Sequence, residues 1–410
     1  MSRTIIFLFP IICCLACQKS ANDPLVQLRR DIGILASDSL QGREVGTEGE
    51  EMAAAYIASR FEEAGLKGKG TEGYFQPFFV RQSQNPHDQP VMSSEDSLQG
   101  TNGKNVIGFI DNPGEELVVI GAHYDHLGYG GFSSLHRGDS AIHNGADDNA
   151  SGVAALLLLS DKLKKMPLNR DFLFIAFSGE EKGLWGSNYF VKNPTINLEM
   201  VNFMVNMDMV GRLDTTRGLA LHGTGTAPEW PAMIDTTNTL GLKVLMKESG
   251  VGPSDHTSFY LQDVPVLHYF TGQHEDYHKP TDDADLINYE GIQKITEHIT
   301  NLIVLTDQKE KLLFQKTKDE SQRGPRFTVT LGVVPDYLFD GKGMRIDGVT
   351  DDKPAQQAGL LKGDIVVQLG DSTVTDMMSY MRALSAFEAG DRTKVTVDRD
   401  GERLTTDIQF

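Results

Sequence analysis

Apolar residues along this chain gather into short continuous runs separated by amphipathic segments. Five runs predict buried strands, at 116–122 (ELVVIGA), 171–177 (DFLFIAF), 200–207 (MVNFMVNM), 218–223 (GLALHG) and 264–270 (VPVLHYF). Residues 151–165 (SGVAALLLLSDKLKK) instead have the apolar spacing of an amphipathic helix. Continuous apolar strands between helices are typical of a sheet covered on both faces. We therefore predict an α/β fold with a mixed, mainly parallel sheet sandwiched by helices.

Two more helices frame this region. The first follows a segment with capping-box spacing at 47–50 and has apolar residues four apart, at Ala53, Ile57 and Phe61. The second closes the region, with apolar residues at Ile292, Ile295, Ile299 and Leu302. Residues 82–104 are polar and rich in turn formers, so a loop is predicted there.

Length and composition indicate two domains, one large and one small, in a chain of 410 residues. The predicted segments are a leader (1–17), a polar tether (18–24), the α/β domain (25–306), a charged linker (307–326) and a second domain (327–410). The second domain has short strands with two helices and ends in a hairpin through Asp400-Gly401.

The leader resembles a bacterial secretion signal. It has one early base, Arg3, and an apolar core too short to span a bilayer. Leu15-Ala16-Cys17 resembles a lipobox, which implies cleavage before Cys17 and lipidation of its thiol. Cys14 stands where an aliphatic residue is usual, so plain secretion is the alternative. We expect a lipoprotein of the bacterial cell envelope, anchored to the membrane by its lipid and facing the periplasm or the exterior.

Charge and cysteine content narrow the chemistry. The 38 basic and 57 acidic residues give a formal net charge of −19, which argues against nucleic-acid binding because that needs a basic surface. All three cysteines lie in the leader (Cys13, Cys14 and Cys17). The mature body therefore has no disulfide and no thiolate ligand, and any metal must be held by His, Asp and Glu.

Residues of those types follow the predicted strands one after another. Ligands of an open α/β sheet bind outside the carboxyl ends of its strands. The segments concerned are His123-Tyr124-Asp125, Asp147-Asp148-Asn149, Ser178-Gly179-Glu180-Glu181, Asp208 and Tyr277-His278-Lys279-Pro280. A single such cluster is often a helix cap, but five at one edge of a sheet predict a metal site.

Five sequence words in this order resemble the di-zinc aminopeptidases of clan MH. The words are GAHYDHLG, GADDNASG, FSGEEKGLWGS, VNMDMVG and DYHKPTDD. The clan includes bacterial leucyl aminopeptidase, glutamate carboxypeptidase II and glutaminyl cyclase, and the resemblance covers about residues 25–306. It implies a zinc exopeptidase fold with two Zn²⁺ ions per chain.

The resemblance implies five metal ligands by their positions in these words. His123 and Asp208 would hold one zinc, Glu181 and His278 would hold the other, and Asp148 would bridge the two.

It also implies supporting roles. Glu180 would be the general base, and Tyr277 would donate a hydrogen bond to the developing oxyanion. Asp125 would accept the other ring proton of His123. The peptide bond between residues 148 and 149 is expected to be cis.

Residues outside these words receive weaker assignments. Asp255 and His256, in SDHTSFY (254–260), are expected to line the pocket or to brace a ligand, with helix capping as the alternative. His126 and His143 are expected to be solvated loop residues. The histidines without a supporting pattern are expected to be structural, namely His222, His268 and His274.

Residues 327–410 resemble a PDZ domain of the bacterial envelope-protease type. The matching words are KPAQQAGLLKGDIVVQLG and VTVDRDGE, with Leu331-Gly332-Val333 in the place of the carboxylate-binding loop. PDZ domains bind extended peptide ends by strand addition. No basic residue flanks this loop immediately in the sequence, so a structural appendage is the alternative.

Together these resemblances predict a zinc-dependent aminopeptidase that acts on peptides with a free N-terminus. A peptide C-terminus is a further expected partner, at the PDZ domain. Glutaminyl cyclase and a carboxypeptidase of the same scaffold are the enzymatic alternatives, and a receptor-like relative without metals is the third. The intact DDNASG word disfavours the cyclase, the complete ligand set disfavours the receptor, and the lack of an arginine patch disfavours the carboxypeptidase.

Overall fold

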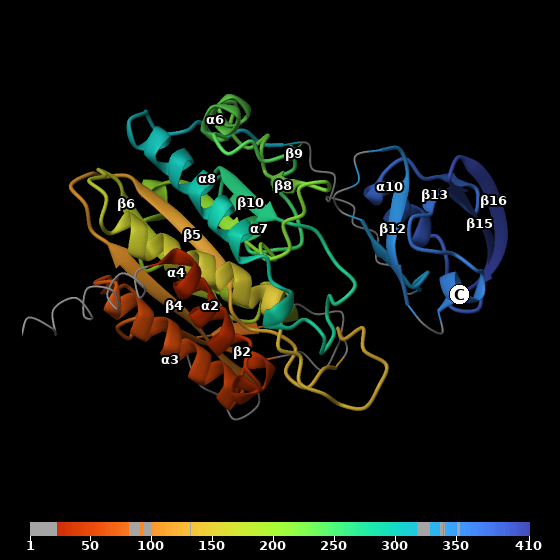
Figure 1. Ribbon diagram of the computed structural model, residues 1–410, viewed down its shortest axis with the longest axis horizontal. Coiled ribbons are helices and arrows are strands. Elements are labelled where there is room, and N and C mark those ends of the chain that lie inside the picture. The colour runs from red at the N-terminus through yellow and green to blue at the C-terminus, as the bar shows by residue number, and fades with distance from the viewer. Residues whose placement is uncertain are drawn as a thin grey trace, which may run out of the picture.

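A computed structural model of the chain describes residues 23–81, 91–93, 100–131, 133–317, 329–336, 339, 341–350 and 353–410. The predicted leader with Cys17 lies outside the described residues, so secretion and lipid anchoring stay predictions. Two sheets form, one in each predicted domain (Figure 1). Within the described part of the chain, no helix has the length and apolar character needed to cross a bilayer.

The larger sheet has ten strands in the order β3-β2-β4-β6-β5-β7-β10-β8-β9, with β1 paired to β4. The strands are β1 (Lys67–Gly68), β2 (Phe75–Arg81), β3 (Val91–Ser93), β4 (Thr101–Ile110), β5 (Leu117–His123), β6 (Asp171–Phe177), β7 (Val201–Met207), β8 (Leu219–His222), β9 (Val244–Lys247) and β10 (Val266–Phe270). The central strands β6, β5, β7 and β10 are parallel, and so are β8 and β9. The remaining pairs are antiparallel, which confirms a mixed sheet.

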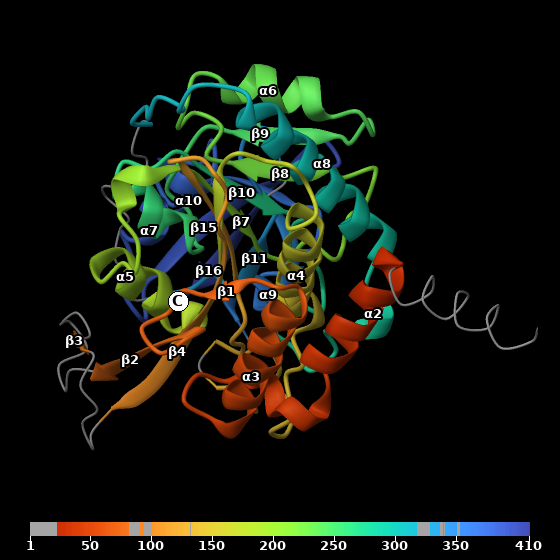
Figure 2. The ribbon, with the colours of Figure 1, turned by 90° about the vertical axis from the view of Figure 1, so that its left-hand side faces the viewer.

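Helices cover both faces of this sheet. They are α2 (Pro24–Leu35), α3 (Glu48–Glu63), α4 (Gly152–Leu163), α5 (Trp185–Lys192), α6 (Trp230–Thr237), α7 (His256–Tyr260) and α8 (Tyr289–Asp307). Figure 2 shows α2, α3, α4 and α8 on one side of the central strands and α5 and α7 on the other. Because both faces are covered, every residue of β5, β6 and β7 is buried, which explains their uninterrupted apolar runs.

The loop predicted for 82–104 is wrong in part. Strand β3 lies inside that range, and β4 begins at Thr101. Both strands pair with β2 through main-chain hydrogen bonds. Main-chain hydrogen bonds do not require apolar side chains, so the polar sequence of this range gave no sign of the two strands.

The smaller sheet has six strands in the order β11-β12-β13-β15-β16, with β14 paired to β13. Its elements are β11 (Val333–Pro335), β12 (Met344–Val349), α9 (Pro354–Gln357), β13 (Ile365–Leu369), β14 (Ser372–Thr373), α10 (Met377–Leu384), β15 (Arg392–Arg399) and β16 (Glu402–Gln409). These elements enclose a separate apolar core that includes Leu331, Ile346 and Val395.

Leucines of different burial give a matched test of this packing. Leu156 of α4 is fully buried, whereas Leu261, after α7, is 62% exposed. We expect Leu156→Ala to lower the free energy of unfolding of this domain by about 2–5 kcal/mol, since the substitution leaves a cavity. Leu261→Ala should change it by less than about 0.5 kcal/mol. Urea unfolding of the full chain measures both, and equal effects would contradict the described burial.

Candidate metal centre

The central strands bring the predicted ligands to one edge of the sheet. His123 is the last residue of β5, and Asp208 directly follows β7. Glu180 and Glu181 begin a short helical turn after β6. Parallel strands end at the same edge, so residues far apart in the sequence meet there.

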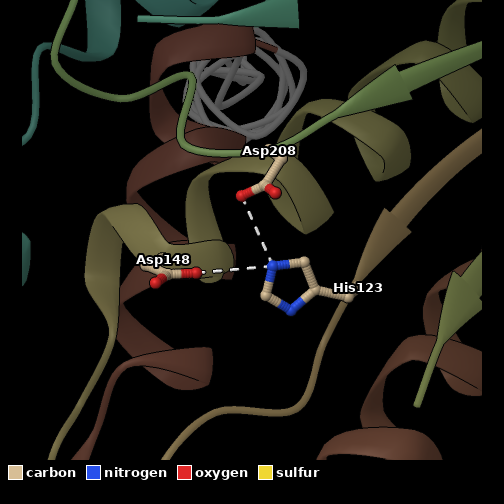
Figure 3. A group of neighbouring side chains, drawn as sticks. All are labelled: His123, Asp148 and Asp208. Atoms are coloured by element: carbon tan, nitrogen blue, oxygen red, sulfur yellow. Dashed lines mark hydrogen bonds and ion pairs between the residues drawn. The ribbon is translucent and has the colours of Figure 1, made fainter. Parts of the chain in front are cut away.

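One group of ligands gathers around His123 (Figure 3). Its Nε2 atom lies 3.4 Å from Asp148 Oδ1 and 3.4 Å from Asp208 Oδ1. In Figure 3 both carboxylates point toward this one nitrogen from separate elements. Nitrogen and oxygen donors at such separations can share one metal ion.

A second group gathers on the other side of Asp148. His278 Nε2 lies 3.2 Å from Asp148 Oδ2 and 3.3 Å from Glu181 Oε1. His126 Nδ1 lies 2.9 Å from the same Glu181 oxygen and 3.9 Å from Asp148 Oδ2. The two oxygens of Asp148 thus face different histidines, which is the arrangement that a bridging carboxylate requires.

Main-chain carbonyls orient both imidazoles. His123 Nδ1 lies 3.2 Å from the carbonyl oxygen of Asp125, and His278 Nδ1 lies 2.8 Å from that of Ser133. A proton on each Nδ1 leaves the Nε2 lone pair facing the carboxylates, which is the tautomer that binds a metal. The Asp125 carboxylate, predicted for this role, is farther from His123, at 3.7 Å.

The Asp125 carboxylate instead accepts main-chain hydrogen bonds from Glu180, at 3.0 Å, and from Glu181, at 3.3 Å. It therefore positions the turn that carries both glutamates. Asp282 acts similarly on the opposite side, since its Oδ2 accepts from the main-chain nitrogens of Asp147 and Asp148 at 2.9 and 3.0 Å. The peptide bond between Asp148 and Asn149 is cis.

Negative charge dominates this centre. Burial raises the pKa of Glu180 well above its usual value; the charge of the His123 ring opposes this shift, and the neighbouring carboxylates of Asp208 and Glu181 add to it. Burial would also raise the pKa of Glu181, but the charge of His278 brings it down to about 2. Burial lowers the pKa of His123 by itself, yet Asp208 and Glu180 raise it well above its usual value.

These shifts show that the clustered carboxylates draw positive charge toward themselves. Divalent cations supply more of it than protonated imidazoles can, and imidazole nitrogen with carboxylate oxygen is a donor set that Zn²⁺ accepts. The described side chains therefore fit two zinc ions.

A cavity of about 100 Å³ opens beside the two groups. Besides the ligands and Glu180, its lining consists of Met209, His222, Pro253, His268, Phe270, Gln273 and Tyr277. Neither lysine nor arginine belongs to the described lining. The ring of Tyr277 stacks on that of His278, with centroids 3.8 Å apart.

Several histidines depart from the expectations. His126 and His143 are buried, not solvated: the first contacts Glu181, and the second lies 2.8 Å from the hydroxyl oxygen of Ser134. His222 and His268 line the cavity in addition to packing in the fold. Burial lowers the pKa of His222 to about 4, so its ring is neutral near pH 7.

Asp255 and His256 do not line the cavity. The ring of His256 stacks on His268, with centroids 4.4 Å apart, so it supports the cavity wall from behind. Asp255 precedes α7 without a side-chain capping bond, so the capping alternative is not realised either. Burial raises the pKa of Asp255 to about 7.

Two buried charged residues behind the centre escaped the sequence analysis. Arg43 donates to the main-chain oxygens of Tyr124, at 2.8 Å, and Asn144, at 2.6 Å, and so ties together the segments on either side of the ligands. Glu50 accepts a bond of 2.6 Å from the main-chain nitrogen of Gly46 and another from the hydroxyl of Tyr124, at 3.1 Å. In the sequence Glu50 has only the signal of a capping-box position, and nothing there indicates its contact with Tyr124.

The predicted carboxylate-binding loop lies at the start of β11. The carbonyl oxygen of Leu331 accepts from Ala355 at 2.8 Å, and that of Gly332 accepts from Thr350 at 2.9 Å. Gly332 has a φ of 77°, which favours glycine.

Residues 105–303 match the family described as peptidase family M28, and residues 311–410 match the PDZ domain. The chain thus combines an M28 peptidase domain with a C-terminal PDZ domain. The resemblance inferred from the sequence words is confirmed by these matches.

Relatives and structures agree with this assignment. Aminopeptidase YwaD of Bacillus subtilis is 28% identical over 214 residues, which are 48% of this chain and 42% of the relative. The chain therefore spans less than half the length of that relative. The structure of BSAP, a zinc aminopeptidase from Bacillus subtilis, has a TM-score of 0.52 at 18% identity, over 70% of this chain and 98% of that one.

A glutaminyl cyclase from Bacteroides thetaiotaomicron has a TM-score of 0.55 at 15% identity, over 70% of this chain and 98% of that one. At this identity the likeness establishes a shared fold and does not distinguish the two activities.

The shared position of Asp148 predicts unequal effects on metal content. We expect the wild type to retain about two Zn²⁺ ions after dialysis, Asp208→Asn about one, and Asp148→Asn neither one tightly, because both groups use Asp148. Metal analysis of the dialysed proteins measures this, with the exposed Asp235→Asn as the control. Two ions retained by Asp148→Asn would contradict the shared ligand.

Glu50 predicts a pH-dependent stability. Burial raises its pKa from 4.5 to about 8 in the folded chain. As pH rises, the unfolded chain therefore releases the proton of Glu50 at a lower pH than the folded chain does. The contribution of protonated Glu50 to the free energy of unfolding is complete below pH 4.5 and is lost as pH rises to about 8.

Relative to Glu50→Gln, the wild type should lose a few kcal/mol of unfolding free energy across this interval, since one pKa unit corresponds to about 1.4 kcal/mol. Urea unfolding at both ends of the interval measures the difference. The exposed Glu48→Gln, on the same helix, is the control and should follow the wild type. A constant difference between wild type and Glu50→Gln would refute the buried-carboxyl assignment.

Proposed function

We propose that this chain, whose residues 105–303 are an M28 peptidase domain, is a two-zinc aminopeptidase that removes the N-terminal residue from peptides. The proposal depends chiefly on one observation: the two oxygens of Asp148 face separate histidines, His123 and His278. A carboxylate placed in this way suits two metal ions close together. In the proposal His123 and Asp208 hold one ion, and Glu181 and His278 hold the other.

The charge of the cavity supports exopeptidase action at the amino end. Its described lining has four carboxylates and no lysine or arginine. A protonated N-terminal amine is attracted to such a site, whereas a substrate carboxylate is repelled. This distribution favours an aminopeptidase over a carboxypeptidase.

Two zinc ions, when bound, would polarise the scissile carbonyl and make water more acidic. Glu180 lies in the cavity lining next to the ligand Glu181. A raised pKa makes its carboxylate a better proton acceptor. In the proposed reaction Glu180 takes a proton from the attacking water and later returns it to the leaving amine, and Tyr277 donates a hydrogen bond to the oxyanion.

The neutral part of the lining would hold the side chain of the first substrate residue. Met209, His222 and Phe270 form part of this wall. Since the His222 ring is neutral, the wall carries no charge of its own near pH 7. An uncharged first side chain is therefore favoured.

Glu180→Gln tests the proton acceptor. We expect turnover of aminoacyl amides to fall by about 10²–10⁴-fold or more, because a neutral amide cannot take the proton. Zinc content should stay near that of the wild type, since Glu180 is not a proposed ligand. The exposed Glu310→Gln is the matched control. Loss of zinc in Glu180→Gln would show that the two adjacent glutamates have exchanged roles.

The same assay distinguishes the reaction classes. A panel of free and N-acetylated aminoacyl amides, run with and without a chelator, should show hydrolysis of the free substrates alone, and only without chelator. Equal cleavage of blocked substrates would refute the N-terminal requirement. Cyclisation of N-terminal glutamine without hydrolysis of the panel would indicate a glutaminyl cyclase.

A further inference from the structure

The PDZ domain meets the peptidase domain at the rim of the catalytic cavity. Arg217, between β7 and β8, lies 3.2 Å from Asp336 Oδ1 and 3.0 Å from Asp347 Oδ2, both buried carboxylates of the PDZ domain. The same guanidinium donates to the main-chain oxygen of Gln273 at 3.2 Å. Gln273 lines the cavity. One side chain therefore links the PDZ sheet to the cavity rim.

Strand β11 runs from the carboxylate-binding loop to this contact. It is the last strand in the order of its sheet, and its outer edge pairs with no strand of the described chain. The loop at 331–333 lies at its start, and Asp336 directly follows its last residue, Pro335. A peptide added along this edge, with its carboxylate at the loop, must run toward Asp336 as it is followed back to its amino end. The amino end therefore leaves the PDZ domain next to the cavity rim.

Lys353 lies beside the loop in the fold, although it is about twenty residues away in the sequence. A Cβ atom at Gly332 would lie 2.1 Å from the Cβ of Lys353, so the lysine stem packs against the loop. Thr330 and Lys353 line one surface pocket there. The Lys353 ammonium forms no ion pair with a described residue. A lysine in this position suits a peptide carboxylate, although no basic residue flanks the loop immediately in the sequence.

We infer that the chain holds one peptide by both ends, with the C-terminal carboxylate at the loop of residues 331–333 beside Lys353 and the N-terminus in the catalytic cavity. This inference rests on the proposed aminopeptidase function. The preferred substrates are then peptides with two free ends that are long enough to span from the loop to the cavity. Shorter peptides are hydrolysed without help from the PDZ domain.

The two sites bind opposite ends of a peptide, and this supports the inference. An aminopeptidase needs the amino end of its substrate, and a PDZ domain binds the carboxyl end. Because β11 is directed from the loop toward Arg217, the remaining chain of a bound peptide points to the cavity and not away from it. Holding the far end raises the local concentration of the near end without any new contact at the reacting bond.

A length series tests the inference on the full chain. Peptides with the same first residue and an apolar last residue, from dipeptides to about 16 residues, span up to roughly 50 Å when extended. Each is prepared as the free acid and as the C-terminal amide. Above a threshold length we expect the free acid to have a kcat/KM about ten-fold or more above that of the amide, mainly through a lower KM. Below the threshold the two forms should be equal.

Lys353→Glu should abolish the preference for the free acid, because the carboxylate introduced at position 353 repels the C-terminal carboxylate of the peptide. Lys342→Glu, an equally charged change at an exposed PDZ position, should keep the preference. Hydrolysis of simple aminoacyl amides should be unchanged in both variants. A failure of all hydrolysis in the wild type would refute the proposed function itself.

Active protein with equal acid and amide rates at every length would overturn the two-ended binding alone. So would a preference for the acid that already exists in dipeptides, because that carboxylate would be recognised in the cavity.

Arg217 would act as a positioning residue in this arrangement. Arg217→Ala should reduce the length-dependent preference, while Arg217→Lys should restore part of it. A long N-acetylated peptide, which can use the loop alone, should bind the Glu180→Gln form with the same affinity in the Arg217→Ala background, since the loop is unaltered. An unchanged preference in Arg217→Ala would overturn the role of this contact.

Discussion

Carboxylates gathered at one edge of the sheet repel one another, and the surrounding fold holds them together despite this repulsion. Asp148 and Asp208 face one imidazole, and Asp148 and Glu181 face another. Such charges are costly when buried unless opposite charge is present. The site therefore favours bound cations, and the proposed zinc chemistry follows from that preference.

A rigid frame holds these charges together. Parallel strands set the spacing of the ligands, and polar groups behind them fix each turn. Asp282 binds the main chain that leads into Asp148, Asp125 binds the turn of the glutamates, and Arg43 joins the flanking segments. Each brace is buried and satisfied by main-chain atoms, so the ligand positions do not depend on exposed side chains.

The cavity of one domain and the loop of the other have side chains of opposite charge. The described cavity lining has four carboxylates, while the loop of the PDZ domain has a lysine packed against it. Arg217 of the peptidase domain contacts Gln273 at the cavity rim and Asp347 of the PDZ domain. In the proposed two-ended binding, a peptide would lie in one orientation, with the bond next to its amino terminus at the metal centre.

Elements with a local signal could be predicted from the order of the residues. The uninterrupted apolar runs of β5 and β6 and the periodicity of α8 reflect burial, and the motif words predicted metal ligands at the strand ends. Three contacts became visible in the folded chain alone: His126 is buried against Glu181, Lys353 packs on Gly332, and Arg217 joins the domains. These contacts join residues distant in sequence, and no period or motif encodes which distant groups meet.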